Sequence, residues 1–474
     1  MSVADPKPAT IEAARRLREA IHGTVVVPGD PAYDDARAVW NGMIDRRPVA
    51  VVRVAAVTDV VAAIGFARDH DLAIAVRGGG HNVAGNGTVD GGLVIDLGGL
   101  RDIEIDDDRR TVRVGAGASL GDLDRATAPL GLIVPGGVVS MTGVAGLTLG
   151  GGVGWTTRTY GLTIDNLVSA ELVTADGSIL HVDDVTEPDL FWGLRGGGGN
   201  FGVVTSFEFR SHPLPDPLYA GAVIHTAEQW ADALTFYAGW VASLPDEMTT
   251  IVTFITPPSG FLPPELDGQP VMLIGFNWSS PDRAEGERLV APLAAFGPPA
   301  VVAIEPVAWV DWQSAVDAIV PKGTRAYWKN CYFDQLDAAT IATIVDIANR
   351  RASPITGVDI HHMGGAFGRV PEDATAFSNR SAGFWLNMYA LWTDPAGDDA
   401  NRTWARESWA AMQPHAAAGM YVNFLGTEGG DEVAIREAAL AAYGERKLAR
   451  LTAIKDRFDP KNVFHMNHNI RPSG

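Results

Sequence analysis

Arg77-Gly-Gly-Gly-His81 is the first group of residues in the chain whose types and spacing suit a chemical role. It directly follows an apolar run that predicts a buried strand. A glycine triplet at a strand end turns backbone N–H groups outward and forms a cradle for an anion such as pyrophosphate. His81 follows at once, where a ligand would approach within bonding distance, although a lone histidine is more often a hydrogen-bonded structural residue. This stretch therefore predicts a phosphate-bearing ligand beside an imidazole.

Further glycine-dense stretches follow in the same half of the chain. They are Gly143 to Trp155, which continues as Arg158-Thr-Tyr-Gly-Leu-Thr-Ile-Asp-Asn166, and Leu194-Arg-Gly-Gly-Gly-Gly-Asn-Phe-Gly-Val-Val-Thr205. Each run alone is a weak signal. Together they predict a long, flat, partly anionic ligand such as FAD, because main chain without a Cβ can lie closely against it. A glycine-rich packing motif without a ligand is the alternative.

Residues 126–157 carry no charge and are long enough for a transmembrane helix. The window nevertheless contains nine glycines, together with Pro129 and Pro135. Each interior glycine costs a helix about 1 kcal/mol relative to alanine. The sequence therefore predicts neither a helix nor a membrane span here.

Two other patterns resemble binding motifs but fail on their context. Gly115-Ala-Gly117-Ala-Ser-Leu-Gly121 follows a predicted strand like a dinucleotide fingerprint, yet no acidic residue stands about twenty positions later to bind a ribose. Nicotinamide binding is therefore not predicted. His361 and His362 are adjacent on a predicted strand, where neighbouring side chains point to opposite faces, so no metal site is expected from them.

The elements that must position these groups fall into two regions. The first region is mixed α/β, with predicted strands at 49–54, 72–76, 93–97, 102–106, 111–114, 168–174 and 203–209 and helices at 58–68 and 119–129, the former with N-cap chemistry from Thr58 and Asp59. A proline-dense passage at 212–218 has the composition of a linker. Beyond it, strands at 220–224, 249–255, 271–278, 324–333, 355–363 and 383–392 alternate with helices at 228–243, 283–296, 336–351, 398–413 and 433–456.

This order predicts an α+β chain whose second domain is an antiparallel sheet backed by helices. The predicted domains are residues 1–215 for the cofactor, 216–415 for the substrate, and a segment 416–474 that returns to the first domain. The polar residues 458–470 after the last helix are expected to reach the binding site.

Length and composition exclude several classes of protein. The 474 residues are 46% apolar and 20% charged, which is typical of a folded chain and excludes long disorder. The net charge is 37 − 57 = −20, so the surface repels nucleic acid. A single cysteine, Cys331, and an N-terminus without an apolar run predict a cytoplasmic protein with no membrane partner. The oligomeric state is not predicted.

The motifs together strongly resemble those of the berberine bridge enzyme-like flavin oxidases, in the vanillyl-alcohol oxidase superfamily with its p-cresol methylhydroxylase-type (PCMH-type) FAD-binding domain. The resemblance rests on the stretches above, on Tyr421-Val-Asn423, and on Asp459-Pro-Lys-Asn-Val-Phe464 with Asn467-His-Asn469. It implies that His81 is bonded covalently to the 8α-methyl group of the flavin. The cysteine that forms a second bond in many relatives would align with Val139, so the resemblance implies one covalent bond only.

The resemblance also implies roles for side chains of the substrate site. Tyr421 matches a tyrosine that removes a hydroxyl proton; a buried hydroxyl bonded to the flavin edge is the alternative. A base of this kind needs a lowered pKa, and Lys329 is the candidate cation. Asn387 stands where alkaloid-cyclising relatives carry a base glutamate, and an amide cannot take that proton. Thr142 stands at the family's oxygen gate, where its small side chain favours an oxidase.

The implied activity is hydride transfer from an alcohol, sugar or amine C–H to flavin N5, with O2 as acceptor and H2O2 as product. A flavin dehydrogenase with another acceptor, a non-catalytic flavin-binding protein and a nicotinamide enzyme are the alternatives. The substrate is expected on the sheet of the second domain, where Trp328, Trp385 and Tyr389 could line its cleft. The residues expected to bind FAD are Arg77, Gly78, Gly79, Gly80, His81, Asn82, Gly85, Gly117, Pro135, Gly136, Thr142, Gly143, Gly146, Leu149, Gly150, Gly151, Gly152, Gly154, Trp155, Asn166, Gly202, Val203, Val204, Tyr421, Asn423 and Asn467.

Overall fold

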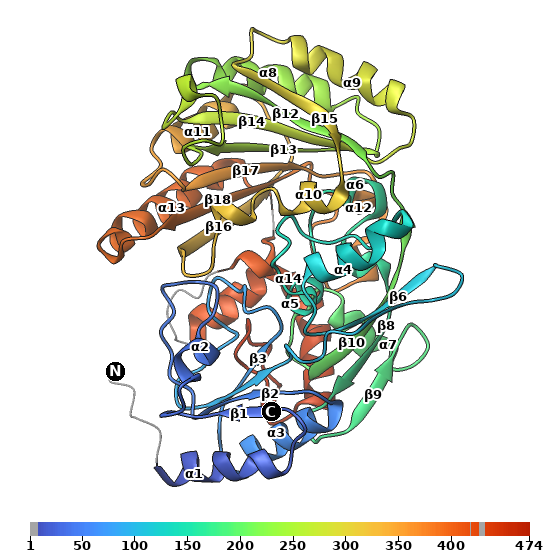
Figure 1. Ribbon diagram of the computed structural model, residues 1–474, viewed down its shortest axis with the longest axis vertical. Helices are drawn as coiled ribbons and strands as arrows, with labels where there is room; N and C mark the ends of the chain where they lie inside the picture. The colour runs from blue at the N-terminus through green and yellow to red at the C-terminus, as the bar shows by residue number, and fades with distance from the viewer. Residues whose placement is uncertain (1–7, 418, 426–431) are drawn as a thin grey trace.

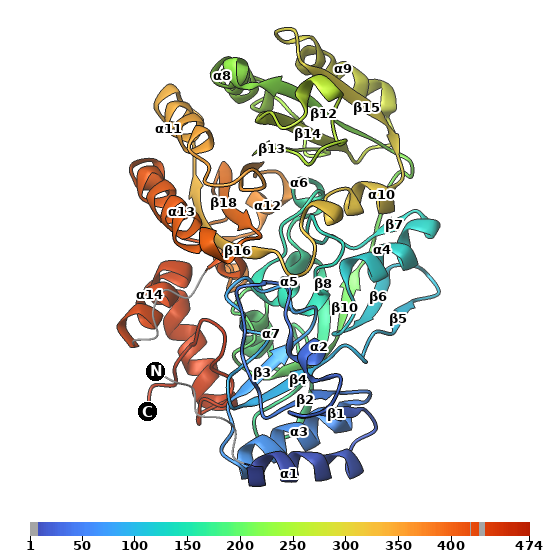
Figure 2. The same ribbon diagram turned by 60° about the vertical axis from the view of Figure 1, so that its left-hand side comes forward.

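The computed structural model describes residues 8–417, 419–425 and 432–474. They form an α+β protein of two lobes, with the N-terminal part of the chain in the lower lobe of Figure 1 and the middle part in the upper lobe. The fold class predicted from the sequence is confirmed. The turned view in Figure 2 shows the last long helix beside the lower lobe, so the chain returns to that lobe near its end.

The lower lobe begins with α1 (Pro8–Arg16), α2 (Tyr33–Arg37) and a four-stranded sheet in the order β1-β2-β4-β3. Its strands are β1 (Thr24–Val26), β2 (Ala50–Arg53), β3 (Ile74–Arg77) and β4 (Leu93–Asp96). β4 is parallel to both β2 and β3, and α3 (Val57–Asp69) connects those two strands. The N-cap of α3 is Ala56 rather than Thr58 or Asp59. Asp59 lies in the first turn, where its carboxylate accepts hydrogen bonds from the N–H groups of Ala55 and Ala56.

A second sheet of the lower lobe is antiparallel throughout, in the order β5-β6-β10-β8-β9. Its strands are β5 (Ile103–Ile105), β6 (Thr111–Gly115), β8 (Leu167–Val173), β9 (Ile179–Val182) and β10 (Val203–Arg210). β6 leads into α4 (Leu120–Thr127), where Ser119 and Asp122 exchange capping hydrogen bonds. Because both neighbours of β6 are antiparallel to it, Gly115–Gly121 is not the turn of a parallel dinucleotide-binding unit.

A complete α-helix, α5 (Val144–Gly150), lies within the uncharged window 126–157, so the expectation of no helix there was wrong. Glycine weakens a helix, but Val144, Ala145 and Leu149 are buried in the core of the lobe, and tertiary packing holds this short turn of helix. Other short elements of this lobe are β7 (Leu132–Ile133), α6 (Thr157–Tyr160), α7 (Pro188–Leu194) and β11 (His212–Pro213). Within the described parts of the chain, no helix is both long and apolar enough to pass through a membrane.

The upper lobe is built on a seven-stranded antiparallel sheet in the order β15-β12-β14-β13-β17-β18-β16. The strands are β12 (Leu218–Thr226), β13 (Met248–Ile255), β14 (Val271–Trp278), β15 (Val301–Val307), β16 (Arg325–Phe333), β17 (Gly357–His362) and β18 (Phe384–Trp392). The sequence predicted each of them except β15. That strand lies at the sheet edge and has no buried residue, so it lacks the apolar signal of the others.

Alternate residues of these strands point to opposite faces of the sheet. One face forms an apolar core with α8 (Trp230–Val241), α9 (Arg283–Ala295), α11 (Ala338–Asn349) and α13 (Asp398–Met412). Figures 1 and 2 show these helices on the outer side of the sheet. The opposite face, which we call the cavity face, looks toward the lower lobe, with α10 (Trp309–Ser314) and α12 (Ala366–Arg369) beside it.

The C-terminal segment is anchored on the lower lobe by a buried lysine. α14 (Glu432–Phe458) bends at Gly444, which has a φ of 68°, and contacts α7. Near its end, Lys455 Nζ donates to the carbonyl oxygens of Asn200 and Phe464, each at 2.8 Å, and to Asp459 Oδ2 at 2.6 Å. The Asp459–Phe464 motif therefore fixes the last residues against the glycine stretch 194–205.

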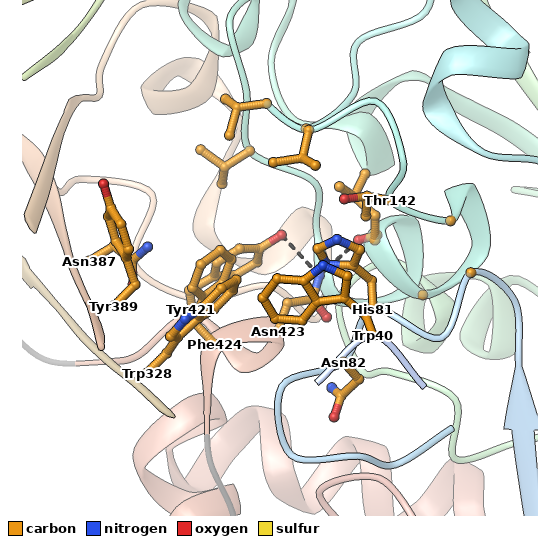
Figure 3. Close-up of a pocket in the computed structure, with 18 of the residues that line it drawn as sticks. Trp40, His81, Asn82, Thr142, Trp328, Asn387, Tyr389, Tyr421, Asn423 and Phe424 are labelled. Atoms are coloured by element: carbon orange, nitrogen blue, oxygen red, sulfur yellow. Dashed lines mark hydrogen bonds between the residues drawn. The ribbon is translucent and has the colours of Figure 1, made fainter. Parts of the chain in front are cut away.

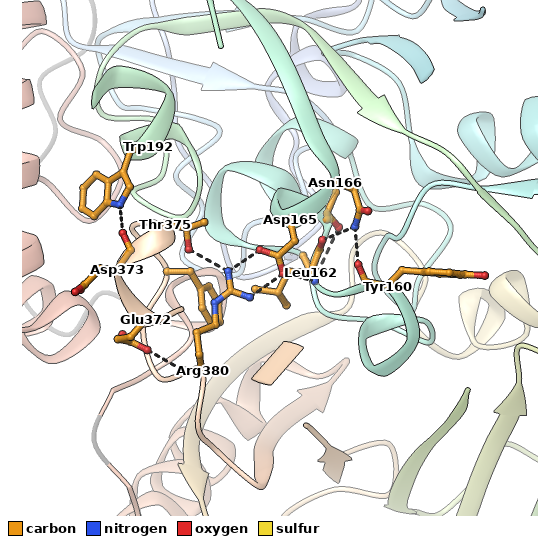
Figure 4. A network of polar contacts seen from close by, with 12 residues as sticks. Tyr160, Leu162, Asp165, Asn166, Trp192, Glu372, Asp373, Thr375 and Arg380 are labelled. Atoms are coloured by element: carbon orange, nitrogen blue, oxygen red, sulfur yellow. Dashed lines mark hydrogen bonds and ion pairs between the residues drawn. The ribbon is translucent and has the colours of Figure 1, made fainter. Parts of the chain in front are cut away.

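A buried ion pair joins the two lobes. Figure 4 shows Arg380 donating to both carboxylate oxygens of Asp165, each at 2.7 Å. From the same motif, Arg158 donates to the carbonyl oxygens of Met248, at 2.9 Å, and of Leu244, at 3.2 Å. The stretch Arg158–Asn166 thus holds the upper lobe on the lower one, and we call Arg158, Asp165 and Arg380 the inter-lobe clamp.

Candidate functional site

A cavity of about 510 Å³ lies between the lobes and is lined by residues of both. Many of the residues predicted to bind the cofactor belong to its lining: Arg77, Gly78, Gly79, Gly80, His81, Asn82, Thr142, Gly143, Gly146, Leu149, Trp155, Gly202, Val204, Tyr421, Asn423 and Asn467. The cavity face supplies the opposite wall. The last residues also reach the lining through Asn467 and His468, as expected from the sequence.

Other residues predicted to bind the cofactor do not belong to the lining: Gly85, Gly117, Pro135, Gly136, Gly150, Gly151, Gly152, Gly154, Asn166 and Val203. Neighbouring backbone requires glycine at positions 117 and 154. A Cβ on Gly117 would lie 1.9 Å from Leu97 O, and one on Gly154 would lie 2.1 Å from Gly136 O. Asn166 donates to the carbonyl oxygens of Tyr160 and Leu162 and so supports the clamp (Figure 4).

The glycines of the lining also serve two purposes. A Cβ on Gly79 would lie 2.4 Å from the backbone nitrogen of Gly143, and one on Gly143 would lie 2.2 Å from that of Gly79. These two residues let two loops touch main chain to main chain. Gly146, on α5, has no atom within 4 Å of its Cβ position although it lines the cavity. The prediction that glycines make room for a ligand therefore fits Gly146, whereas Gly79 and Gly143 are explained by packing.

His81 stands at the lower wall of the cavity beside Trp40. The two rings stack with centroids 4.6 Å apart, and Figure 3 shows them together across the cavity from Asn387 and Tyr389. Burial lowers the pKa of His81 to about 4, so the imidazole is neutral at pH 7. Its Nε2 atom is buried and has no hydrogen-bond partner among the described residues. The ring therefore offers a nitrogen lone pair or a proton to whatever occupies the cavity.

Unpartnered buried polar atoms recur around this lining. They are Arg77 Nη1, His81 Nε2, Asn86 Nδ2, Trp312 Nε1, Trp328 Nε1, Asn387 Oδ1, Tyr443 Oη and His468 Nε2, none of which has a partner within the described chain. Buried polar atoms without partners are rare in native proteins, and a bound ligand would satisfy these. Arg77 additionally donates to Asp96 at 2.9 Å, so its charge is balanced while one nitrogen is left for an acceptor such as a phosphate. The residues present fit a large polar ligand such as FAD.

Tyr421 is buried at the junction of the two walls. Its Oη accepts hydrogen bonds from the N–H of Gly152, at 2.9 Å, and from Asn423 Nδ2, at 3.0 Å (Figure 3). Burial raises the pKa of Tyr421 to about 12, although both hydrogen bonds act in the opposite direction. At neutral pH the residue therefore keeps its proton, and that proton is not used by either donor. This setting favours the hydrogen-bonded hydroxyl over the base.

The backbone of Tyr421 is fixed by the sheet. Asn330 Oδ1 accepts from the Tyr421 N–H at 2.9 Å, and Phe424 stacks on both Tyr421 and Trp328, with centroids 5.3 Å and 4.7 Å away. Asn330 and Trp328 both come from β16. Trp328, Trp385 and Tyr389 line the cavity, as predicted from the sequence.

The expectation that Lys329 lowers the pKa of Tyr421 was wrong. Lys329 lies on β16 between Trp328 and Asn330 and therefore points to the helix side of the sheet. Its Nζ lies 5.8 Å from the ring centroid of Tyr327 and 5.4 Å from that of Trp409 on α13. Strand periodicity alone could have excluded it.

The same periodicity places Cys331 on β16 and the adjacent His361 and His362 on β17. Val139 lines the cavity, whereas Cys331 is buried on the helix side of the sheet, where burial raises the pKa of the thiol to about 12. His361 lines the cavity, but His362 contacts Arg158 Nη1 at 3.2 Å instead. Within the described residues no cluster of three or more His, Cys, Asp or Glu side chains could hold a metal.

Asp359 is a cavity-lining residue that was not predicted from the sequence, and its carboxyl group can accept hydrogen bonds and exchange a proton. It lies on β17 and pairs with Thr253 on one side and Asn387 on the other. Tyr389 Oη donates to its Oδ1 at 3.0 Å. Burial raises the pKa of this carboxyl to about 7, and the hydroxyls of Thr253 and Tyr389 only partly oppose that shift. Strand parity with Asn387 would have been the signal.

Comparison with known proteins agrees with this geometry. The family model described as FAD binding domain matches residues 48–183, and the model described as berberine and berberine like matches residues 420–471. The chain is 32% identical over 463 residues to (R)-6-hydroxynicotine oxidase of Paenarthrobacter nicotinovorans, which covers 96% of this chain and 98% of that protein. It is 31% identical over 459 residues to an FAD-linked oxidoreductase of Dictyostelium discoideum, with 96% of each chain covered.

A solved structure extends the likeness to the fold. The crystal structure of 6-hydroxy-D-nicotine oxidase from Arthrobacter nicotinovorans superposes with a TM-score of 0.84 at 28% identity and covers 96% of this chain and 98% of that one. The two matched family models include His81, at one wall of the cavity, and Tyr421, at the junction of the two walls. The chain is therefore an FAD-dependent oxidoreductase and belongs to the berberine bridge enzyme-like family, as its motifs predicted.

Proposed function

We propose that the chain is an oxidase that takes a hydride from an alcohol, sugar or amine C–H onto N5 of FAD, with the cofactor bonded covalently to His81 alone and dioxygen as the electron acceptor. The observation that carries the proposal is the setting of His81, a neutral imidazole with an unpartnered nitrogen at the wall of a cavity large enough for a guest. In this division of the chain, residues 1–215 bind FAD, 216–415 bind substrate and 416–474 complete the cofactor site.

The covalent bond balances with dioxygen as the oxidant. Joining a ring nitrogen of His81 to the 8α-carbon removes the imidazole N–H proton and one C–H hydrogen of the methyl group, and the two electrons released reduce O2 to H2O2. A single bond is proposed because Val139 offers no thiol and Cys331 lies on the far face of the sheet.

The bound cofactor supplies the acceptor for two electrons from the substrate. The chain's own residues hold both partners and exclude water. Arg77 presents a nitrogen to an anionic group, Trp40 packs on the His81 ring, and Tyr421 donates its hydroxyl proton to an acceptor in the cavity. Thr142 lines the cavity with a small side chain, which supports access of dioxygen to it.

Acid precipitation tests the covalent bond. In the unmodified protein the yellow colour should stay with the precipitated polypeptide, and in His81→Ala it should pass to the supernatant. His361→Ala is the matched control, because it also removes an imidazole from the lining and should keep the colour on the polypeptide. Colour in the supernatant of the unmodified protein would refute the covalent bond while leaving the family assignment intact.

Peroxide yield tests the acceptor. Under air, an oxidase should release one H2O2 for each substrate molecule oxidised, whereas a dehydrogenase should release little and should need an added quinone or dye for turnover. The ratio of H2O2 formed to product formed, followed with an oxygen electrode and a peroxide assay, distinguishes the two.

A further inference from the structure

Among the described residues, the cavity lining carries a single acidic side chain. Of the cavity-lining residues that the structure describes, Asp359 is the one carboxylate, and the one permanently charged base, Arg77, lies in the opposite wall and is paired with Asp96. The neighbours of Asp359 on the adjacent strands are the uncharged side chains of Thr253 and Asn387. Apolar side chains line the cavity as well, namely Ile251, Leu273 and Leu391. Trp385 and Tyr389 add aromatic rings.

The neighbours of Asp359 hold it in place without neutralising it. Tyr389 donates one hydrogen bond, at 3.0 Å, and no lysine or arginine forms an ion pair with the carboxylate within the described chain. Tyr389 can reach it because Gly357 stands opposite on β17: a Cβ there would lie 2.3 Å from Tyr389 Oη. The glycine therefore lets the phenol lie across β17 with its hydroxyl at Asp359, two residues further along.

We infer that Asp359 is the specificity-determining residue of the cavity and that it selects substrates carrying an aliphatic ammonium group beside an aromatic or apolar ring. The inference rests on the proposed function and narrows its substrate class from alcohols, sugars and amines to amines. The ammonium donates a hydrogen bond to Asp359 while Trp385 and Tyr389 contact its ring and its charge.

The surroundings of Asp359 argue against the other classes. A sugar hydroxyl could donate a hydrogen bond to this carboxylate but would leave its negative charge unbalanced. Ile251, Leu273 and Leu391 in the same lining offer a sugar no further hydrogen bond. An anionic substrate would meet an unpaired like charge. An ammonium satisfies the carboxylate, and it can also pass one proton from its nitrogen to an Asp359 oxygen. That transfer frees the nitrogen lone pair before the neighbouring C–H bond breaks.

Three other titratable groups bear on this carboxylate. Tyr389 stays protonated because burial raises its pKa well above the usual value, and His361, two residues along the same face, is kept neutral because burial lowers its pKa to about 3. Arg351 lowers the pKa of Tyr389 through its charge, but less strongly than burial raises it. Between pH 6 and 8 Asp359 is therefore the group whose charge changes.

The test uses a pair of probes that cannot be turned over. 2-Phenylpropan-2-amine is a cation at neutral pH and has no hydrogen on the carbon beside nitrogen, and 2-phenylpropan-2-ol is its uncharged isostere. Calorimetric titration of the purified yellow protein at pH 8 should show about tenfold tighter binding of the amine, as a charge-assisted hydrogen bond predicts. The advantage of the amine should shrink as the pH falls to 6.

The variants separate the carboxylate from its surroundings. Asp359→Asn should bind amine and alcohol within about twofold of each other at either pH. Tyr389→Phe keeps the carboxylate and should keep the preference. Asp346→Asn, an exposed position on α11 paired with Arg350, is the matched control and should behave like the unmodified protein.

The outcomes are distinguishable from failure of the proposed function. Equal binding of amine and alcohol by yellow, folded protein would overturn the inference, and so would an amine preference that survives in Asp359→Asn. A protein that holds no flavin would overturn the proposed function instead, and the two probes would still report on Asp359.

Discussion

At the scale of the residue, two aromatic hydroxyls of the cavity lining, those of Tyr421 and Tyr389, have different partners. Tyr421 accepts two hydrogen bonds, from Gly152 and Asn423, whereas Tyr389 donates one, to Asp359. The first arrangement leaves a proton available to a guest, and the second uses its proton to hold a carboxylate. Both residues line the cavity, and these partners give their hydroxyls different chemistry.

The proton of Tyr421 should resist removal up to high pH. Burial raises its pKa to about 12, so the ultraviolet difference between the unmodified protein and Tyr421→Phe should show no tyrosinate absorbance between pH 6 and 10. The measurement needs no substrate. A tyrosinate signal with a midpoint below pH 9 would show that the residue is poised as a base.

Sequence reasoning located the residues that stand in contiguous motifs. His81 and Tyr421 could be found because each lies in a short, ordered pattern of neighbours. Asp359 could not, because its setting arises from strands far apart in the chain, through Thr253 and Tyr389. Lys329 was misplaced because its charge was considered without the parity of its strand.

At the scale of the element, the glycine stretches combine loop contacts with space for a guest. The predicted strands and the long helices were found because their periodicity is local. The helix α5 was missed because its glycines oppose a helix locally, while the core of the lobe stabilises it. Only the structure separates glycines that touch polypeptide from those that face the cavity.

A pair of substitutions should separate these two kinds of glycine. Gly143→Ala places a Cβ 2.2 Å from the backbone of Gly79 and should lower the free energy of unfolding by about 1–3 kcal/mol or more. Gly146→Ala meets no atom within 4 Å and lies in a helix, so stability should be kept or raised by up to about 1 kcal/mol.

The same two variants should differ in cofactor content. The Gly146→Ala methyl group enters the cavity, so this variant should fold and yet hold less flavin per chain. Thermal unfolding and the ratio of flavin to protein absorbance measure both effects. Full flavin content in a stable Gly146→Ala protein would mean that no ligand approaches α5 at this point.

At the scale of the whole molecule, a buried carboxyl marks a second contact between the lobes. Asp124 on α4 accepts a hydrogen bond from Trp309 Nε1 of α10 at 2.7 Å, and its Oδ2 is buried without a partner within the described residues. Burial raises the pKa of Asp124 to about 7. The lobes thus meet at the ion pair of the clamp and at this carboxyl.

Stability should fall as the pH rises through the titration of Asp124. The native state keeps the proton up to about pH 7, while the unfolded chain releases it near pH 3.8, so between these values the native state binds more protons and loses stability with rising pH. Asp124→Asn removes this dependence. The free energy of unfolding of Asp124→Asn minus that of the unmodified protein should therefore increase by up to roughly 4 kcal/mol between pH 4 and pH 8.

Thermal unfolding at pH 5.5 and at pH 8 tests whether the titration of Asp124 lowers the stability as the pH rises. The midpoint temperature of Asp124→Asn minus that of the unmodified protein should increase between these two values, while Asp346→Asn, at an exposed position, should give the same difference at both. A difference that decreases with pH would mean that Asp124 is ionised in the native protein.

The cavity draws its two walls from separate stretches of the chain, and this separation has an evolutionary consequence. The lower wall depends on glycines locked main chain to main chain, where few replacements are tolerated. The cavity face consists of alternate side chains on the strands of a sheet, and that sheet is stabilised by the apolar core on its opposite, helix-covered face. During evolution these side chains can be replaced one by one, so that the enzyme accepts new substrates while its cofactor-binding wall is inherited unchanged.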